Sequence, residues 1–183
     1  MLPFPLPPRL GWLRDEESGR RWLAGLPETV AACVDRWSLR VGMPYQDSLV
    51  SLVLPATRAD GSPAVLKLQF PDRESEHEAT ALRRWAGHGA IRLLDEDRPR
   101  RALLLEACRP GTPLSTLDLD AALDVYAGLL PRLWVPAGKP FGSLAEEANG
   151  WADRLPDHWE QAGRPFERRL VDAAVELLRG LAG

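Results

Sequence analysis

The chain has 183 residues, 45% of them hydrophobic and 27% charged, as is ordinary for a soluble globular protein with one domain or two small ones. Its formal net charge of −3 does not predict nucleic-acid binding. No apolar run approaches the ~18 residues that a membrane span needs, and the proline-rich start lacks the features of a secretory signal. The two cysteines, Cys33 and Cys108, have no metal-binding or disulfide spacing, which predicts a reducing, cytoplasmic location.

The proline-rich first ten residues indicate an extended arm, and the residues after them indicate two helices. Residues 12–26 carry tryptophan and leucine among charged residues, which indicates an amphipathic helix that ends near Pro27. A second helix is expected from Pro27 to about Arg36, because proline fits the first turn of a helix. Residues 37–58 then predict a β-hairpin with its turn at residues 43–47, and the Asp-Gly pair at residues 60–61 marks the next turn.

The following segment combines a strand and a helix that each carry one charged residue on a partly apolar surface. Residues 63–70 alternate in the period-2 pattern of a strand, with Lys67 in the middle. Residues 72–85 predict a helix in which Glu78 shares the apolar stripe of Leu82 and Trp85. Each charge would be costly to bury alone, so an ion pair is one interpretation. A half-solvated lysine and a glutamate that reaches solvent are the other, and spacing alone leaves both open.

The order of the next elements favours the ion pair. Residues 90–94 and 102–106 predict two strands, joined by a polar turn at residues 95–101, and residues 107–111 form a linker. A strand with lysine, a helix with glutamate, two strands and a hinge follow one another in the small lobe of kinases. In that lobe the lysine binds the α- and β-phosphates and the glutamate holds the lysine.

The resemblance to a known family is carried mainly by residues 87–114, which read G-H-G-A-I-R-L-L-D-E-D-R-P-R-R-A-L-L-L-E-A-C-R-P-G-T-P-L. This segment resembles the aminoglycoside phosphotransferase family, in particular its streptomycin and hydroxyurea kinase branch. The L-K strand and the H-E-A-T-A-L helix agree with it, and the resemblance extends over roughly residues 37–114.

The resemblance implies an α+β fold in which residues 1–108 form a kinase-like small lobe with an N-terminal helical arm. This lobe would hold an antiparallel sheet of about five strands and one central helix. Residues 109–183 would form the hinge and the first helices of a helical large lobe. The implied activity uses ATP and Mg²⁺ to phosphorylate a hydroxyl group of a small acceptor such as an aminoglycoside.

The same resemblance assigns roles at the phosphate end of the nucleotide site. Lys67 would bind the phosphates and Glu78 would hold Lys67, with Glu74, one turn away, as the alternative partner. The turn at residues 43–47 lacks a G-x-G-x-x-G motif, so backbone N–H groups and a hydroxyl such as that of Ser48 would contact the phosphates. A plain hairpin turn would have much the same sequence.

The hinge would bind adenine through its backbone. If Leu105 ends the strand, the carbonyl of Glu106 and the N–H of Cys108 are the expected partners of the adenine edge. Cys108 would act through its backbone rather than as a reactive thiol, and the Glu106 side chain would be solvated. The expected apolar roof of this pocket consists of Val65, Leu39 and Val53.

After the hinge the pattern is helical. Helices are expected at residues 119–134, at residues 144–162 with an interruption near Pro156, and from Pro165 onward. Their apolar stripes are expected to be exposed in a chain of this length, which predicts self-association.

Phosphoryl transfer also needs a catalytic Asp and metal-binding Asn and Asp residues, which the resembled family carries in an H-G-D-x-x-x-x-N loop and a later strand. No His of this chain is followed two residues later by Asp, and the residue five before the single asparagine, Asn149, is Leu144. We therefore assign no catalytic or metal-binding residue and expect the chain alone to be inactive. It would be a fragment of a kinase, a short non-catalytic nucleotide-binding or protein-interaction module, or one part of a split enzyme.

Overall fold

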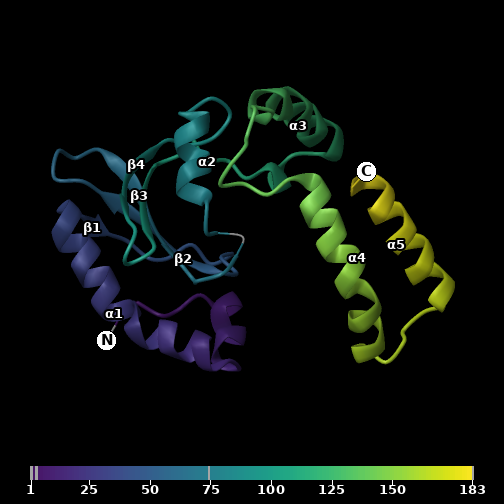
Figure 1. Cartoon of the computed structure of the whole chain (residues 1–183). Coiled ribbons are helices and arrows are strands. Elements are labelled where there is room, and N and C mark those ends of the chain that lie inside the picture. Colours follow the sequence, from purple (N-terminus) through teal and green to yellow (C-terminus); the bar gives the residue numbers. More distant parts are fainter. Residues whose placement is uncertain (1, 3, 74, 183) are drawn as a thin grey trace. The chain divides into compact units, whose positions relative to one another are not determined.

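The computed structural model describes residues 2, 4–73 and 75–182, which form two compact units that divide between Val135 and Pro136. The elements of the first unit are η1 (Pro8–Arg14), α1 (Glu17–Trp37), β1 (Arg40–Val41), β2 (Ser51–Thr57), β3 (Pro63–Gln69), α2 (Glu78–Trp85), β4 (Leu93–Asp97), β5 (Ala102–Glu106), η2 (Leu114–Thr116) and α3 (Leu119–Leu133). The second unit holds α4 (Leu144–Gln161) and α5 (Arg168–Ala182). The expected α+β fold, an antiparallel sheet with a central helix followed by further helices, is confirmed (Figure 1).

The sheet has the strand order β1-β2-β3-β5-β4, and every neighbouring pair is antiparallel. β3 is the central strand, and its Lys67 lies opposite Val53 of β2 and Leu103 of β5. The lysine predicted to lie inside a strand is therefore at the middle of the sheet, with a paired strand on each side.

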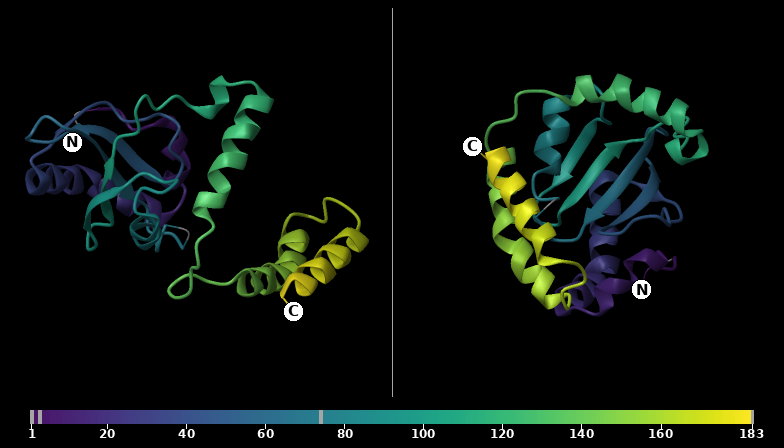
Figure 2. Two further views of the ribbon diagram at one scale, coloured as in Figure 1. Left: turned by 90° about the horizontal axis from the view of Figure 1, so that it is seen from above. Right: turned by 90° about the vertical axis from the view of Figure 1, so that its right-hand side faces the viewer.

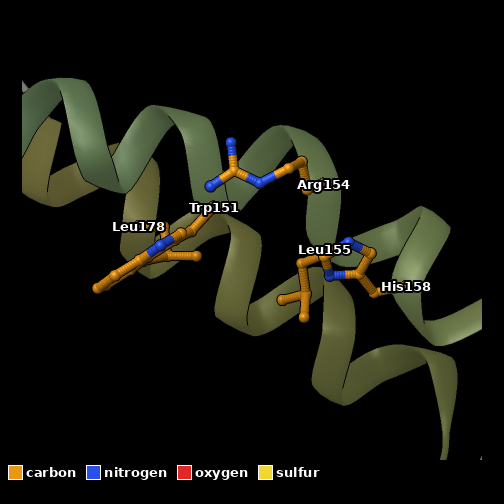
Figure 3. A pocket seen from close by; sticks show the side chains of 5 residues that line it. All are labelled: Trp151, Arg154, Leu155, His158 and Leu178. Atoms are coloured by element: carbon orange, nitrogen blue, oxygen red, sulfur yellow. The ribbon is translucent and has the colours of Figure 1, made fainter. Parts of the chain in front are cut away.

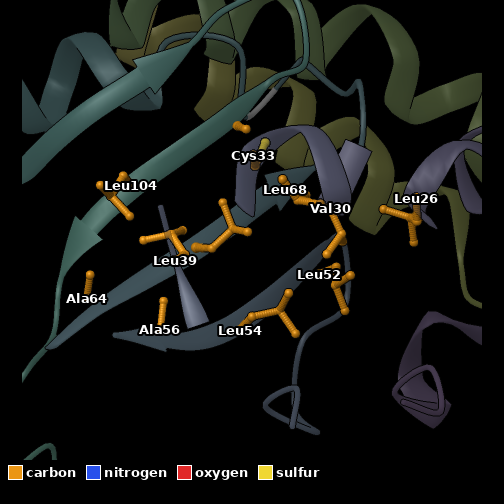
Figure 4. Packing of buried hydrophobic residues seen from close by; sticks show 12 residues of the cluster. Leu26, Val30, Cys33, Leu39, Leu52, Leu54, Ala56, Ala64, Leu68 and Leu104 are labelled. Atoms are coloured by element: carbon orange, nitrogen blue, oxygen red, sulfur yellow. The ribbon is translucent and has the colours of Figure 1, made fainter. Parts of the chain in front are cut away.

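The two faces of the sheet pack against different helices, α1 on one side and α2 on the other (Figure 1). Because side chains alternate along a strand, every second residue of β2, β3 and β5 faces α1. The buried cluster on that face consists of Leu26, Val30, Cys33, Leu39, Leu52, Leu54, Ala56, Ala64, Leu66, Leu68, Ala102 and Leu104 (Figure 4). The opposite face carries Lys67 and a smaller cluster, in which Ala79 and Leu82 of α2 pack on Leu103 and Leu105.

Helix α1 differs from the predicted pair of helices, because it continues through Pro27 from Glu17 to Trp37. Proline lacks the N–H of one helical hydrogen bond. The Thr29 hydroxyl donates to the carbonyl of Gly25 in the same turn, over 3.0 Å. Leu26 and Val30, on either side of the proline, are buried against the sheet, and this packing outweighs the local penalty. The start of the helix predicted over residues 12–26 belongs instead to the separate 3₁₀ helix η1, which ends at Arg14.

Two further boundaries differ from the sequence prediction. The helix expected over residues 72–85 begins only at Glu78, because the Asp72 side chain accepts a hydrogen bond from the N–H of Ser75 and closes a turn. The strand expected at residues 90–94 is β4 at Leu93–Asp97, while Ala90 and Ile91 pack against the cluster that α2 forms with β5. The charged residues of β4 are tolerated because β4 is an edge strand.

The second unit is a pair of helices that lie side by side in both views of Figure 2. α4 begins with a capping box in which Ser143 and Glu146 exchange hydrogen bonds, and it continues through Pro156 without the predicted interruption. Arg179 of α5 bonds to Asn149 and Asp153 of α4. Among the described residues, no helix combines the length and the apolar character of a membrane span.

Candidate functional site

The predicted ion pair between Lys67 and Glu78 is confirmed. The Lys67 Nζ donates to both carboxylate oxygens of Glu78, over 2.7 Å to Oε1 and 2.8 Å to Oε2. The two side chains are 24% and 25% exposed, so the pair is mostly shielded from bulk water. The two charges are therefore paired with each other, unlike in the alternative of a half-solvated lysine and a glutamate that reaches solvent on its own. Glu74, the other proposed partner, lies outside the described residues.

The pair forms because β3 and α2 each present one charged residue to the same layer. Lys67 belongs to the face of β3 that alternates away from Leu66 and Leu68, and Glu78 is the first residue of α2. An acidic residue in the first turn also suits the positive end of the helix dipole. Hydrogen bonds between two ionised groups are short and stronger than neutral ones. The arrangement therefore fixes an ammonium group in the middle of the sheet.

Gln69 is a member of this site that the sequence prediction missed. Its Nε2 donates to the Glu78 Oε2 over 2.7 Å and to the backbone oxygen of Ser75 over 3.2 Å. The sequence held one signal for it, because Gln69 lies two residues after Lys67 and thus on the same face of the strand. That spacing alone did not indicate that a glutamine would reach the carboxylate.

The loop between β1 and β2, residues 42–50, begins as a hairpin next to the site. The N–H groups of Gly42 and Tyr45 donate to the carbonyls of Pro55 and Val53. Ser48 lies farther along this loop and is half-buried. Its predicted role toward phosphate stays a prediction.

The N-terminal helix η1 donates hydrogen bonds to the second half of the loop at residues 42–50. The Trp12 indole N–H donates to the carbonyl of Leu49 over 2.9 Å, and Arg9 donates to the carbonyl of Asp47 over 3.4 Å. The ring of Trp12 packs edge-on against Phe70. The 3₁₀ helix η1 thus positions the loop, and among the described residues of the arm predicted over the first ten, only residues 8–10 are helical.

A hollow of about 500 Å³ lies where the sheet meets the linker after β5. It is lined by Arg40, Val41, Gly42, Tyr45, Pro55, Ala56, Thr57, Pro63, Ala64, Ala107, Cys108, Arg109 and Pro110. Cys108 is exposed there. The left-handed backbone of Gly111, whose φ is +71°, lets the chain turn close to the carbonyl of Cys108, where any side chain would clash.

The predicted apolar roof is partly wrong. Leu39 packs in the α1-side cluster with Leu26 and Val30, so it lies on the opposite face of the sheet from Val65 (Figure 4). The prediction treated Leu39 as part of a regular hairpin strand, in which side chains alternate between the two faces. Leu39 instead lies before β1, where this alternation does not apply. Val65 lies opposite Leu105 in the sheet.

The strand β5 spans Ala102–Glu106, as predicted, so Leu105 is not the residue that ends it, as the adenine contacts had assumed. The N–H of Glu106 donates to the carbonyl of Arg92. Its side chain is not merely solvated, because it accepts hydrogen bonds from the N–H and the guanidinium of Arg92, each over 3.0 Å. These contacts lower the pKa of Glu106. Arg92 therefore ties β4 to the start of the linker.

The second unit has a separate groove of about 440 Å³ between α4 and α5, shown in Figure 3. Trp151, Arg154, Leu155, His158 and Leu178 line it. None of the predicted site residues lies in this groove. Its lining is mainly apolar, as expected for two amphipathic helices packed along one side.

Comparison with known proteins gives one family model, described as aminoglycoside/hydroxyurea antibiotic resistance kinase, that matches residues 36–182. A hydroxyurea phosphotransferase of Kitasatospora aureofaciens is 44% identical over 165 residues, which cover 87% of this chain and 48% of the relative. Streptomycin 6-kinases of Streptomyces griseus and Streptomyces glaucescens are 43% and 39% identical, over 76% and 91% of this chain and 48% and 55% of their own lengths. The chain thus spans about half the length of these relatives. No solved structure gave a significant match.

Proposed function

Because the chain belongs to the aminoglycoside/hydroxyurea antibiotic resistance kinase family, we propose that it is the nucleotide-binding part of an ATP-dependent phosphotransferase. The whole enzyme would transfer the γ-phosphoryl group of ATP to a hydroxyl group of a small acceptor, such as an aminoglycoside like streptomycin, or hydroxyurea. Residues 1–108 would be its small lobe, and residues 109–183 the hinge and the start of its large lobe. We place the protein in the cytoplasm, in keeping with its two unpaired cysteines.

The observation that carries the proposal is the two-pronged bond between Lys67 and Glu78. In kinases such a pair places a lysine amine against the α- and β-phosphates. Glu78 would keep the amine in place, and Lys67 would donate its remaining N–H to a phosphate oxygen. Ser48 and the backbone of residues 42–50 would contact the phosphates from the loop.

Adenine would enter the hollow beside the linker. Its edge would meet the carbonyl of Glu106 and the N–H of Cys108. Val65, Leu105 and Val53 are not among the residues that line the hollow and would contact the base only from the α2-facing side of the sheet. The support is the volume of about 500 Å³ and a lining that combines the sheet end with residues 107–110. A pocket of this size suits a nucleotide base with its sugar.

The catalytic carboxylate and the ligands of Mg²⁺ are proposed to lie outside these 183 residues. Among the residues that the structure describes, no three His, Cys, Asp or Glu side chains gather as a metal site, so we assign no step to a metal here. The sequence has no H-G-D-x-x-x-x-N loop. Incubation of residues 1–183 with ATP, Mg²⁺ and streptomycin or hydroxyurea should release no ADP above background, and clear turnover would refute this part of the proposal.

Nucleotide binding itself is tested by titration of the chain with ATP in the presence of Mg²⁺. We expect saturable binding that Lys67→Ala weakens about tenfold to hundredfold, the range for loss of a hydrogen bond to a charged group. Lys139→Ala is the matched control, because Lys139 is the other lysine of the chain and is exposed. An ATP affinity that Lys67→Ala leaves unchanged would place the nucleotide elsewhere.

A second candidate function, a non-catalytic protein-interaction module, is favoured by α3. Leu119 and Trp134 at its ends are 73% and 74% exposed, and Leu123 and Tyr126 between them are also exposed. Such a surface commonly packs against another chain or against itself. Light scattering and the ATP titration together separate the cases, because self-association is expected of both and only the enzyme part is expected to bind ATP.

A further inference from the structure

Gln69 connects three elements around the Lys67–Glu78 pair. The residue is only 5% exposed at the end of β3. Its amide reaches Glu78, the first residue of α2, and the backbone oxygen of Ser75 in the preceding loop. One side chain thus joins the strand that carries the lysine to the helix that carries the glutamate.

We propose that Gln69 is a positioning residue that fixes the Glu78 carboxylate and, through it, the amine of Lys67. The relevance of this arrangement to phosphate binding rests on the proposed function. The mechanical part of the inference concerns only the three side chains, and it can be tested without a nucleotide.

The hydrogen-bonding chemistry supports this role. A primary amide has two N–H donors on the same nitrogen. The two partners of Gln69, a carboxylate and a backbone carbonyl, can only accept, so this orientation of the amide satisfies both. If Lys67 were its only partner, the Glu78 side chain could change rotamer and the long lysine side chain could move with it. The second donor, the Gln69 amide anchored in the sheet, holds the carboxylate in one position. The amide is also neutral, so it leaves the charge balance of the pair unchanged.

The backbone of Gln69 is itself anchored. Its N–H donates to the carbonyl of Arg101 over 3.0 Å, and its carbonyl accepts the indole N–H of Trp22 from α1 over 3.1 Å. The guanidinium of Arg101 also donates to the Ser75 hydroxyl over 3.0 Å, so the loop that receives the Gln69 amide is held from a second side. The donor to Glu78 therefore projects from a fixed base.

The test uses the chain of residues 1–183, in which Lys67 and Lys139 are the only lysines. Brief treatment with limiting acetic anhydride, followed by peptide mass spectrometry, gives the ratio of acetylation at Lys67 to that at exposed Lys139. Gln69→Met keeps the size of the side chain but removes both N–H donors. We expect it to raise this ratio roughly fivefold to tenfold, because one hydrogen bond to a charged, partly solvated carboxylate is lost. Glu78→Ala should raise it at least as much.

The double variant Gln69→Met with Glu78→Ala separates positioning from a general structural role. If Gln69 acts through Glu78, the double variant has the same ratio as Glu78→Ala alone. An unchanged ratio in Gln69→Met, or a full additional increase on top of Glu78→Ala, would overturn the proposal. If circular dichroism shows that Gln69→Met does not fold, Gln69→Asn, whose amide is one methylene too short, should give an intermediate ratio, and a wild-type ratio would overturn the proposal.

Titration with ATP and Mg²⁺ then links the result to function. If the wild-type chain binds ATP, Gln69→Met should weaken binding to an extent similar to Glu78→Ala, and unchanged binding would refute the functional part of the inference. If the wild-type chain does not bind ATP, the proposed function of this chain fails, while the acetylation ratios still decide whether Gln69 positions the pair.

Discussion

The two cysteines allow a direct test of the proposed adenine site, because they differ in exposure. Cys33 of α1 is fully buried, and burial, aided by the nearby Asp97, raises its pKa from 9.0 to about 11. Cys108 is exposed and lines the hollow beside the linker. We predict that N-ethylmaleimide modifies Cys108 but not Cys33. Bound ATP should protect Cys108 from this modification.

The expected rates follow from the thiolate fraction and from occupancy. The rise in the pKa of Cys33 from 9.0 to about 11 lowers its own thiolate fraction at pH 8 about a hundredfold, before burial slows access further. ATP at ten times its dissociation constant leaves about one site in eleven free. If adenine covers Cys108, ATP should therefore slow its alkylation about tenfold.

Intact-mass spectrometry over time measures both effects. One fast addition should appear, it should disappear in Cys108→Ser, and it should persist in Cys33→Ala. ATP concentrations that saturate the binding titration should slow this addition, while the same concentrations of inorganic phosphate should not. Alkylation of Cys108 at an unchanged rate under saturating ATP would refute the placement of adenine at residues 106–108.

Three further predictions concern the stability of the first unit. The folded-state pKa of Cys33 is raised, so the neutral thiol contributes fully to stability below pH 9. As the pH rises from 9 toward 11, the free energy of unfolding should fall by about 2 to 3 kcal/mol. Urea unfolding measures this fall, and the Cys33→Ala variant should not show it. Leu66→Ala, at a fully buried position between α1 and the sheet, should lower the free energy of unfolding by about 2 to 5 kcal/mol, whereas exposed Leu123→Ala should change it by less than about 0.5 kcal/mol in the same assay. Asp118→Ala removes the side chain that accepts from the N–H of Ala121 at the start of α3 and should cost about 1 kcal/mol, measured by thermal unfolding followed by circular dichroism; an unchanged midpoint would contradict the capping role.

Residue alternation, combined with the order of the elements, predicted the centre of the site. A strand in which Leu66 and Leu68 face one side must turn Lys67 toward the other, and a helix with Glu78 on its apolar stripe must bring that carboxylate to the sheet. These two local rules, together with the order of the elements, predicted a contact between side chains 11 residues apart that the structure contains.

The features that sequence reasoning missed depend on contacts between distant segments. Pro27 was expected to end a helix, but the packing of α1 on the sheet outweighs one missing hydrogen bond. Leu39 was assigned to the wrong face because it lies outside the regular strand, where alternation no longer applies. Gln69 was missed because its role depends on how the loop before α2 places Ser75 and Glu78, which no periodicity encodes.

The charge balance of the site indicates what this part of the chain would contribute to phosphate binding. The positive charge of Lys67 is offset by Glu78 before a nucleotide arrives, and that of Arg92 is offset by Glu106. A neutral pair attracts a triphosphate weakly at long range, and the net charge of −3 adds no attraction. The pair therefore contributes by positioning an N–H donor at a fixed point. A phosphate oxygen can accept a hydrogen bond there without the entropic cost of ordering the lysine side chain, because Glu78 already orders it. In the proposed function the residues around β3 align the nucleotide, and the strong neutralisation of its phosphates falls to the magnesium ion and the residues that hold it.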